Sequence, residues 1–421
     1  MKRTLITTFS IFILLFCWSC TASDDDDCQD CETAVADDDA DDDDDTDAPA
    51  CVTDELRCGE GDIPEKCENG EWIAQSLCPR LHYCNFGDCV DTLIYFPDDE
   101  APHRDMIEWW YWTGDVTDAD GNMYGFELTF FYGARVLNIP AWMIHVGIVD
   151  ESAGEHEGNV WYDFGQPDEN PNELHLSSGT ASVDRGEDYV YELVGDAGNY
   201  GYDFTLTDVK GPIYHGGLGA VRMSSRTADS FYYSRPRIDV EGILYKDGEP
   251  IEVTGEAWMD HQWGNFIPFS LIGWDWFSMR LSDNTEIMYF IFRGDEQDWS
   301  VVDMALGTYI DENGDQTILS EDEIIVEYYD IWESSVTEGV YPQNWNFRVP
   351  GLDLDVDITT GIADQEMPNF FWNYWEGMMN VEGMKDGQPV TGRGFVELSG
   401  YAGRPIFWQF FDVWDEKDFR F

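Results

Sequence analysis

The sequence is poor in basic residues. Its 421 residues include 22 Lys and Arg against 86 Asp and Glu, which gives a formal net charge of -64 at pH 7. A field of this sign repels nucleic acids and anionic lipid surfaces, so we predict no nucleic-acid partner. The excess of acid is typical of a protein that stays soluble in a saline exterior, where salt screens its self-repulsion.

Several motifs of common enzymes are also missing. The chain has no G-x-S-x-G nucleophile turn, no phosphate-binding glycine loop and no dinucleotide fingerprint, so serine hydrolysis and a nucleotide ligand have no support. His103, His145 and His215 are too far apart in sequence for the usual spacing of zinc ligands, and no loop fits an EF-hand. We therefore predict no metal and no cofactor.

Cysteine is absent after residue 89. Apart from Cys17 and Cys20 in the N-terminal segment, eight cysteines lie between residues 28 and 89. An even set in a short exported segment predicts disulfides, which small modules need because their cores are meagre. Zinc is the competing interpretation, because Cys28-x-x-Cys31 has ligand-like spacing. We predict a disulfide module over residues 51–92, without fixing the pairing, that contains Cys51, Cys58, Cys67, Cys78, Cys84 and Cys89.

The N-terminus begins with Lys2 and Arg3 and continues into the longest apolar run of the chain. This pattern predicts a signal peptide over residues 1–19, and it is too short for a stable membrane span. Ser19-Cys20 resembles a bacterial lipoprotein cleavage site, which implies acylated Cys20, a membrane anchor and placement in the cell envelope, at the outer membrane. Ordinary cleavage after Ala22 is the alternative. The Asp-rich residues 20–50 predict a disordered acidic tether.

From about residue 95 the sequence consists of short alternating segments rich in aromatic and β-branched residues, separated by Asp-Gly and Asn-Gly turns. This sequence pattern predicts an all-β fold. VEGILYKDGEPIEVTG at 240–255 aligns with VEGMKDGQPVTG at 381–392 when two gaps are allowed. We therefore expect a duplication, with two tandem β-barrels over residues 95–268 and 269–421, rather than chance convergence of hairpins.

Six stretches, in order, resemble the AttH/CrtC family, which includes the carotenoid 1,2-hydratases: EWWYWTGDV, YGFELTFF, YYSRPRI, GEAWMDHQWG, YWEGMMNVEG and GRGFVELSGY. The resemblance covers about residues 95–421. It implies two lipocalin-like (calycin-type) barrels and an apolar ligand such as a polyene or terpenoid, which some relatives hydrate or cyclise. One departure is Glu127, at a position where the family commonly carries glutamine.

The stretch EAWMDHQWGNF places an acid between tryptophans. Burial against aromatic rings keeps an aspartic acid protonated to higher pH, and the ring faces stabilise a developing cation. Side chains alternate along a strand, so Asp260 shares a face with Trp258 while His261 points the other way. We predict Asp260 as a catalytic acid. The alternative is that Asp260 only forms a structural ion pair with Arg235 or Arg237.

Three further polar residues have predicted roles. Glu108 opens the EWWYW strand and serves either as a second carboxylate that activates water or as an exposed strand end. Glu376 has a similar setting in YWEG, and for both we favour the structural interpretation. His261 is predicted to orient a neighbour across the strand. Large aromatic side chains are mostly core, but some line the ligand site: Trp110, Trp112, Tyr233, Trp258, Trp263, Trp276 and Trp375.

The resulting hypothesis is an exported, lipid-anchored protein whose barrels bind an apolar small molecule. If it is an enzyme, it hydrates or cyclises an alkene. Two alternatives remain: a carrier that uses the same barrels without chemistry, and a surface protein in which the cysteine-rich module recognises a partner.

Overall fold

The computed structural model describes residues 92–403 except 104, 134–140, 166–173, 223–228, 266–272, 294–301 and 368–372, and parts of residues 51–90. The predicted signal peptide, Cys20, the tether over residues 20–50 and Cys78 lie outside the described residues. The same holds for the side chains of Cys58, Cys84 and Cys89. No helix among the described residues has the length and apolarity needed to cross a bilayer.

The described part of the cysteine-rich module is a small antiparallel sheet. It contains β1 (Leu56–Cys58), β2 (Pro64–Glu68) and β3 (Glu71–Ala74), and a separate pair is formed by β4 (Tyr83–Asn85) and β5 (Asp88–Val90). A disulfide joins Cys51 to Cys67, whose side chain is fully buried. A sheet this small has little apolar area to bury, so the covalent link supplies much of its stability.

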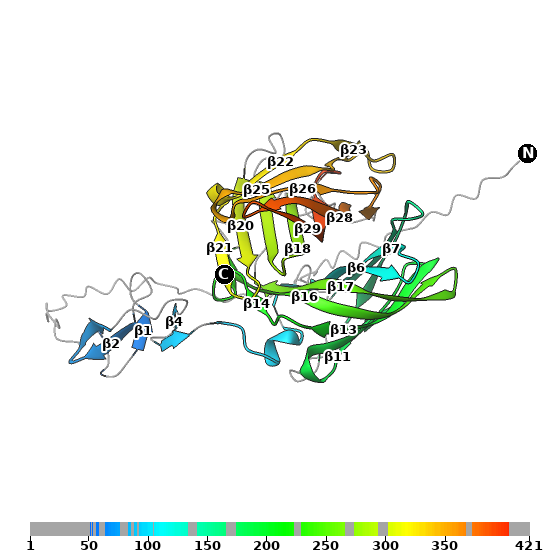
Figure 1. The fold of residues 1–421 in the computed structure, drawn as a ribbon. Helices are drawn as coiled ribbons and strands as arrows, with labels where there is room; N and C mark the ends of the chain where they lie inside the picture. Colours follow the sequence, from blue (N-terminus) through cyan, green and yellow to red (C-terminus); the bar gives the residue numbers. More distant parts are fainter. Residues whose placement is uncertain are drawn as a thin grey trace, which may run out of the picture. The chain divides into compact units, whose positions relative to one another are not determined.

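The first large sheet curls into a near-closed barrel, drawn from cyan to green in Figure 1. Its main path runs β10-β11-β12-β13-β16-β17-β6-β7-β8-β9, with two short strands paired to β16. The strands are β6 (Ile107–Asp118), β7 (Met123–Tyr132), β8 (Ala141–Asp150), β9 (Glu155–Phe164), β10 (His175–Ser178), β11 (Ala181–Arg185), β12 (Val190–Asp196), β13 (Tyr200–Asp208), β14 (Ile213–Tyr214), β15 (Ala220–Arg222), β16 (Asp229–Lys246) and β17 (Glu249–Gly264).

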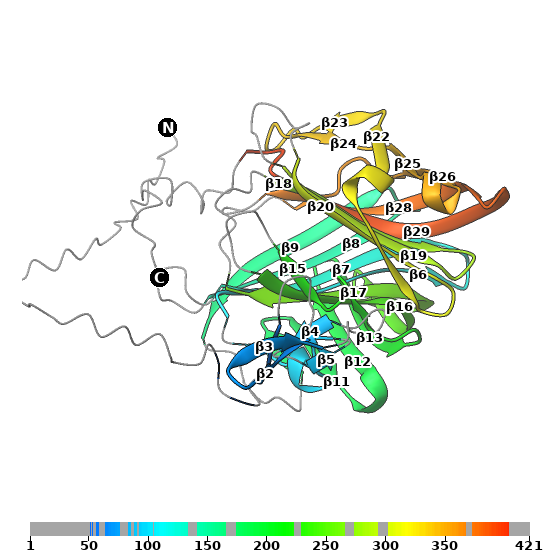
Figure 2. The same ribbon diagram turned by 90° about the vertical axis from the view of Figure 1, so that its left-hand side faces the viewer.

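The second large sheet is a curled half-barrel, drawn from yellow to red in Figure 2. Its path runs β21-β20-β19-β18-β29-β28-β26-β25-β22, and β27 pairs with β28. The strands are β18 (Gly273–Leu281), β19 (Glu286–Arg293), β20 (Val302–Ile310), β21 (Gln316–Leu319), β22 (Ile325–Tyr328), β25 (Trp345–Val349), β26 (Leu354–Thr359), β27 (Glu366–Met367), β28 (Tyr374–Lys385) and β29 (Gln388–Ser399); β23 (Ile331–Glu333) and β24 (Val340–Pro342) form a separate hairpin.

The helical content of the described residues is limited to single 3-10 turns. The first, η1, precedes the first barrel, and the others lie in connections: η1 (Asp98–Glu100), η3 (Glu187–Tyr189), η4 (Glu321–Glu323) and η5 (Pro350–Leu352). The predicted all-β fold with two tandem barrel-type sheets is therefore confirmed, as a near-closed barrel followed by a curled half-barrel.

The sequence repeat corresponds to equivalent hairpins. β16 and β17 turn at Asp247-Gly248, and β28 and β29 turn at Asp386-Gly387. All four turn residues have positive φ, which Asp and Gly tolerate and which the tight turns of hairpins require. β17 then pairs with β6, and β29 pairs with β18 in the same way.

Because side chains alternate in direction along each strand, each sheet has apolar side chains on both its inner and its outer face. The inner face of the first barrel includes Trp110, Trp112, Phe126, Tyr202 and Phe204, and the inner face of the second sheet is a separate core. A third cluster contains side chains of both sheets, such as Tyr111, Trp258, Trp276, Phe290 and Phe395. We call this contact between the outer face of the first barrel and the second sheet the junction.

Candidate functional site

Strand register places a row of polar residues on the outer face of the first barrel. Asp260 of β17, Tyr111 of β6, Thr129 of β7 and His145 of β8 are successive partners across the four strands. Their neighbours in sequence point to the barrel core, so this row points outward into the junction.

The second sheet contributes a matching row. Trp276 of β18, Glu397 of β29 and Glu376 of β28 are successive cross-strand partners. The two rows are in contact, because the Tyr111 hydroxyl donates a short hydrogen bond to the Glu376 carboxylate. The junction therefore holds a polar band between large apolar side chains.

Asp260 is buried in this band with three hydrogen-bond donors. Tyr232 donates to Oδ2 at 2.5 Å, and Trp258 Nε1 donates to Oδ1 at 2.6 Å. The Ser234 hydroxyl also donates to Oδ1. Burial raises the pKa of Asp260 to about 6, although these three hydrogen bonds act to lower it.

The Asp260 network extends into both sheets. His215 Nε2 lies 2.6 Å from Ser234 Oγ, and His215 Nδ1 lies 2.9 Å from Thr308 Oγ1 of β20. Burial lowers the pKa of His215 to about 3, so this ring stays neutral. Trp276 of the second sheet donates from Nε1 to the Tyr232 hydroxyl at 3.1 Å. Residues from both sheets therefore hold Asp260 in place.

Three glutamates beside Asp260 also favour their protonated forms. Burial raises the pKa of Glu127 to about 7, and burial together with the charge of Glu127 raises the pKa of Glu397 to about 8. Burial and the charges of Glu397 and Glu127 raise the pKa of Glu376 well above its usual range. Like charges in a dry region cannot all ionise, so the junction retains protons at neutral pH.

The junction also holds polar atoms that lack a hydrogen-bond partner among the described residues. They include Glu127 Oε2, Glu376 Oε2 and His145 Nε2. Burial lowers the pKa of His145 to about 3, so its ring is neutral. Unsatisfied buried atoms of this kind are rare in folded proteins, and a bound ligand or water is one way to satisfy them.

The structure separates Asp260 from the other two predicted catalytic residues. His261 and Glu108 lie on the inner face of the first barrel, where His261 Nε2 is 2.8 Å from Glu108 Oε1. The ring of His261 stacks on Trp110 with centroids 4.6 Å apart. Glu108 therefore does not act together with Asp260 across one site. Both side chains are fully buried, so the interpretation of Glu108 as an exposed strand end is wrong.

Glu108 has a second partner, His103, that no spacing in the sequence indicates. His103 Nδ1 lies 2.7 Å from Glu108 Oε1, and the His103 backbone N–H donates to Oε2 at 2.8 Å. Burial acts to raise the pKa of Glu108, but hydrogen bonds and the charges of both histidines lower it overall. Burial acts to lower the pKa of His103, but hydrogen bonds to Asp99 and Glu108 raise it to about 9.

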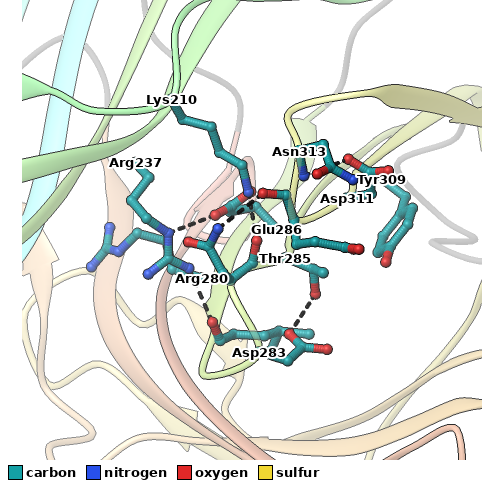
Figure 3. Close-up of polar contacts among 12 residues, drawn as sticks. Lys210, Arg237, Arg280, Asp283, Thr285, Glu286, Tyr309, Asp311 and Asn313 are labelled. Carbon is teal, nitrogen blue, oxygen red and sulfur yellow. Dashed lines mark hydrogen bonds and ion pairs between the residues drawn. The ribbon is translucent and has the colours of Figure 1, made fainter.

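The two arginines form ion pairs, but not with Asp260. Arg235 points into the first barrel and pairs with Glu100 at 2.7 Å and with Asp208. Arg237 points into the junction, where its Nε lies 2.6 Å from Glu286 Oε1 (Figure 3). The alternative that Asp260 is held by an arginine is therefore wrong; hydroxyl and indole donors hold it instead.

The predicted ligand-binding aromatics are divided among three regions. Trp258 and Trp276 lie in the junction, with centroids 6.4 Å apart. Trp375 belongs to the core of the second sheet. The inner core of the first barrel contains Trp110, Trp112, Tyr233 and Trp263. Only the first pair lies beside the carboxyl cluster.

Several residues of the junction were not predicted as functional. Tyr111, Glu127, His145 and Glu397 come from different strands, and only the pairing of the strands brings them together. Glu127 did stand out as a departure from the family pattern, and Glu376 was assigned a structural role. The signal that was available is an acid at the outward position of an otherwise apolar strand, as in YWEG.

Together, the fold and the junction define a class: paired all-β barrels with a buried cluster of carboxyl groups between them. The family model for AttH-like proteins matches residues 90–401, and the chain belongs to this AttH-like family. No curated protein matches the chain.

Two solved structures are similar over most of the chain. One, described as an AttH from Nitrosomonas europaea, is 29% identical with a TM-score of 0.66, covering 73% of this chain and 97% of that one. The other is kievitone hydratase from Nectria haematococca, 19% identical with a TM-score of 0.62, covering 75% and 94%. The second likeness shows a shared fold.

Proposed function

We propose that the protein binds an apolar small molecule at the junction and catalyses acid-assisted addition of water to it, or its cyclisation. The apolar side chains around the carboxyl cluster favour a polyene, terpenoid or other lipid-like alkene as the ligand. One observation carries the proposal: the Asp260 carboxyl lies buried against Trp258 and Tyr232 and keeps a proton at higher pH than an ordinary aspartate.

In this mechanism Asp260 transfers its proton to one carbon of the alkene. The π electrons form the new C–H bond, and the neighbouring carbon becomes cationic. The faces of Trp258 and Trp276 stabilise that charge, and water then captures it in the hydration reaction. The proton that the added water releases returns to the Asp260 carboxylate, so the enzyme is unchanged. The likeness in fold to kievitone hydratase is consistent with this chemistry.

The ligand is identified first. The purified protein is extracted with organic solvent, and co-purified molecules are analysed by mass spectrometry. An apolar alkene is expected. If no apolar molecule is recovered, the protein instead belongs to the class of surface proteins in which the barrels are a scaffold.

The catalytic role is tested with Asp260→Asn. Asn keeps the shape and an acceptor oxygen but cannot donate the acidic proton. We expect turnover of the recovered alkene, followed by incorporation of oxygen from H₂¹⁸O, to fall at least about 100-fold, with binding retained. Undiminished turnover in the variant would show that Asp260 is not the acid.

The same experiment evaluates the carrier function. The three donors from the protein's own side chains satisfy both oxygens of Asp260, as in a structural network, and this favours a carrier. A parent protein that binds the alkene but never converts it is a carrier.

We further propose that the chain is exported and anchored to the outer membrane through acylated Cys20. The support is the signal-like N-terminus followed by Ser19-Cys20. Cys20→Ala is expected to move the protein from the membrane fraction to the soluble fraction of the envelope. An unchanged membrane fraction would contradict the anchor.

A further inference from the structure

Three side chains with metal-binding atoms meet on the inner side of the first barrel. His103, Glu108 and His261 each offer one ligand atom, and these atoms all lie within 4.8 Å of one another. His103 Nδ1 and His261 Nε2 lie 2.7 Å and 2.8 Å from the same oxygen, Glu108 Oε1. The group is separate from the junction, because Asp260 points to the opposite side of the barrel wall.

The fold holds the three donors in place from different parts of the chain. His103 follows η1, ahead of the first barrel strand, while Glu108 lies near the start of β6. His261 lies on β17, two residues from Trp263, the cross-strand partner of Glu108. Glu108 and His261 therefore lie on two paired strands, and His103 lies in the segment that leads into β6.

Each histidine ring is also oriented from its other nitrogen. His103 Nε2 lies 3.3 Å from the Asp99 carboxylate, and His261 Nδ1 lies 3.3 Å from the Tyr233 hydroxyl. Trp263 stacks on His103 with centroids 4.2 Å apart and an interplanar angle of 5°. A partner on the far nitrogen is the arrangement that fixes the tautomer and direction of metal-ligating histidines.

The distances suit a small cation with only a slight adjustment. Zn–N and Zn–O bonds of about 2.1 Å place tetrahedral ligand atoms about 3.4 Å apart. The two histidine nitrogens would move from 2.7 and 2.8 Å to about 3.4 Å from the Glu108 oxygen, a change of about 0.6–0.7 Å each. His103 is the least buried of the three donors, because its side chain is 19% exposed while the other two are 0% exposed.

In contrast to the sequence-based expectation of no metal, we infer that His103, Glu108 and His261 form a binding site for a divalent transition-metal ion inside the first barrel. Two imidazoles and one carboxylate form a donor set that suits Zn²⁺ and its neighbours rather than Ca²⁺ or Mg²⁺. The bound ion ties the segment before β6 to the barrel wall. It replaces the two hydrogen bonds that Glu108 Oε1 now accepts, and the ring protons that the two histidines donate in those bonds are released to solvent.

The test uses the full chain with its disulfides intact, so that free thiols do not bind the probe. The protein is stripped with a chelator, and Zn²⁺ binding is measured by isothermal titration calorimetry. Co²⁺ is used as a spectroscopic probe of the ligand set. We expect one tight equivalent of Zn²⁺ per chain, above the weak binding expected of a chain with net charge -64.

Two variants each remove one proposed metal ligand, and a third variant is the matched control. His261→Gln and the half-buried His103→Gln are each expected to weaken the tight site at least about 100-fold and to remove the visible Co²⁺ bands. The control is His175→Gln, because His175 makes a comparable contact with Asp184 on the surface. It should bind Zn²⁺ as the parent protein does.

A fold-sensitive readout separates metal binding from misfolding. Saturating Zn²⁺ should raise the Tm of the parent and of His175→Gln by several degrees, and should leave the Tm of His103→Gln nearly unchanged. If the parent, His103→Gln and His261→Gln bind Zn²⁺ alike, or if the parent has no tight site, the inference is overturned. The three residues are then a hydrogen-bonded ion cluster only.

Discussion

At the scale of single residues, Glu127 shows how the junction keeps its protons. Its side chain is 2% exposed, Oε1 accepts a hydrogen bond from Thr129 at 2.6 Å, and Oε2 has no hydrogen-bond partner among the described residues. A charge there is poorly solvated, so burial raises the pKa to about 7. In the unfolded chain the same carboxyl loses its proton near its ordinary pKa of 4.5.

The difference between the two states makes the stability of the protein depend on pH. Between about pH 4.5 and 7 the folded state binds a proton that the unfolded state has lost. The free energy of unfolding therefore falls as the pH rises through this window, and it stays lower above it. Glu127→Gln should remove this part of the dependence and stabilise the protein at pH 8 by roughly 1–3 kcal/mol, with little effect at pH 4.5.

Urea unfolding at both pH values measures the effect. Glu249→Gln, at an exposed strand start, is the matched control and should change stability little at either pH. An equal effect of Glu127→Gln at pH 4.5 and pH 8 would mean that Glu127 is not held protonated in the folded state.

Some of the site follows from local sequence, and some does not. The two-residue period of a strand correctly predicts that Asp260 and His261 point to opposite sides. The partners of those side chains depend on which strands become neighbours. His103 reaches Glu108 from a segment outside the sheet, and no spacing in the sequence indicates that contact.

At the scale of elements, the hairpin turns were predictable, but a bulge was not. Asp-Gly pairs predict the turns of β16–β17 and β28–β29 because both turn residues need positive φ. Between Arg235 and Ile238 the register of β16 shifts at Pro236, which cannot donate to the ladder. The shift sends Arg235 inward and Arg237 into the junction, so two residues that a regular strand would place on one face are separated.

The close pairing of β6 and β17 gives a prediction at this scale. A Cβ added at Gly255 would lie 1.9 Å from the Asp115 carbonyl oxygen and 2.7 Å from Val116 Cα. Both are backbone atoms that cannot rotate away. We therefore expect Gly255→Ala to destabilise the protein by roughly 3 kcal/mol or more in urea unfolding.

Gly351→Ala is the matched control, because nothing lies within 4 Å of the Cβ it would add and no positive φ is required there. Its effect should stay within about 0.5 kcal/mol. If both alanine variants have the same stability, the close approach of β6 and β17 does not exist in solution.

At the scale of the whole molecule, ion pairs join the two sheets at one end of the junction. Glu286 of β19 forms ion pairs with two side chains of the first barrel, Lys210 at 2.7 Å and Arg237 at 2.6 Å (Figure 3). In the opposite direction, Arg280 of β18 pairs with Asp115 of β6. Removing Glu286 would take the carboxylate partner from Lys210 and would leave Arg237 paired only with Glu256 of its own barrel, so these contacts fix how the sheets meet.

The duplication places equivalent strands in the two halves of the molecule. Each half repeats the same hairpin beside its first strand, so β6 and β18 occupy equivalent positions in their sheets. The sequence repeat indicated the two halves, but it carried no information on which outer faces would meet. That depends on complementary apolar side chains and charges drawn from both halves.

The most direct test is a ¹³C NMR titration of the aspartate side-chain carboxyls in the whole protein, with the Asp260 signal assigned by its loss in Asp260→Asn. If the junction shields this carboxyl from water, Asp260 titrates near pH 6. An Asp260 signal that titrates near pH 4, as an ordinary solvated aspartate does, would contradict the account.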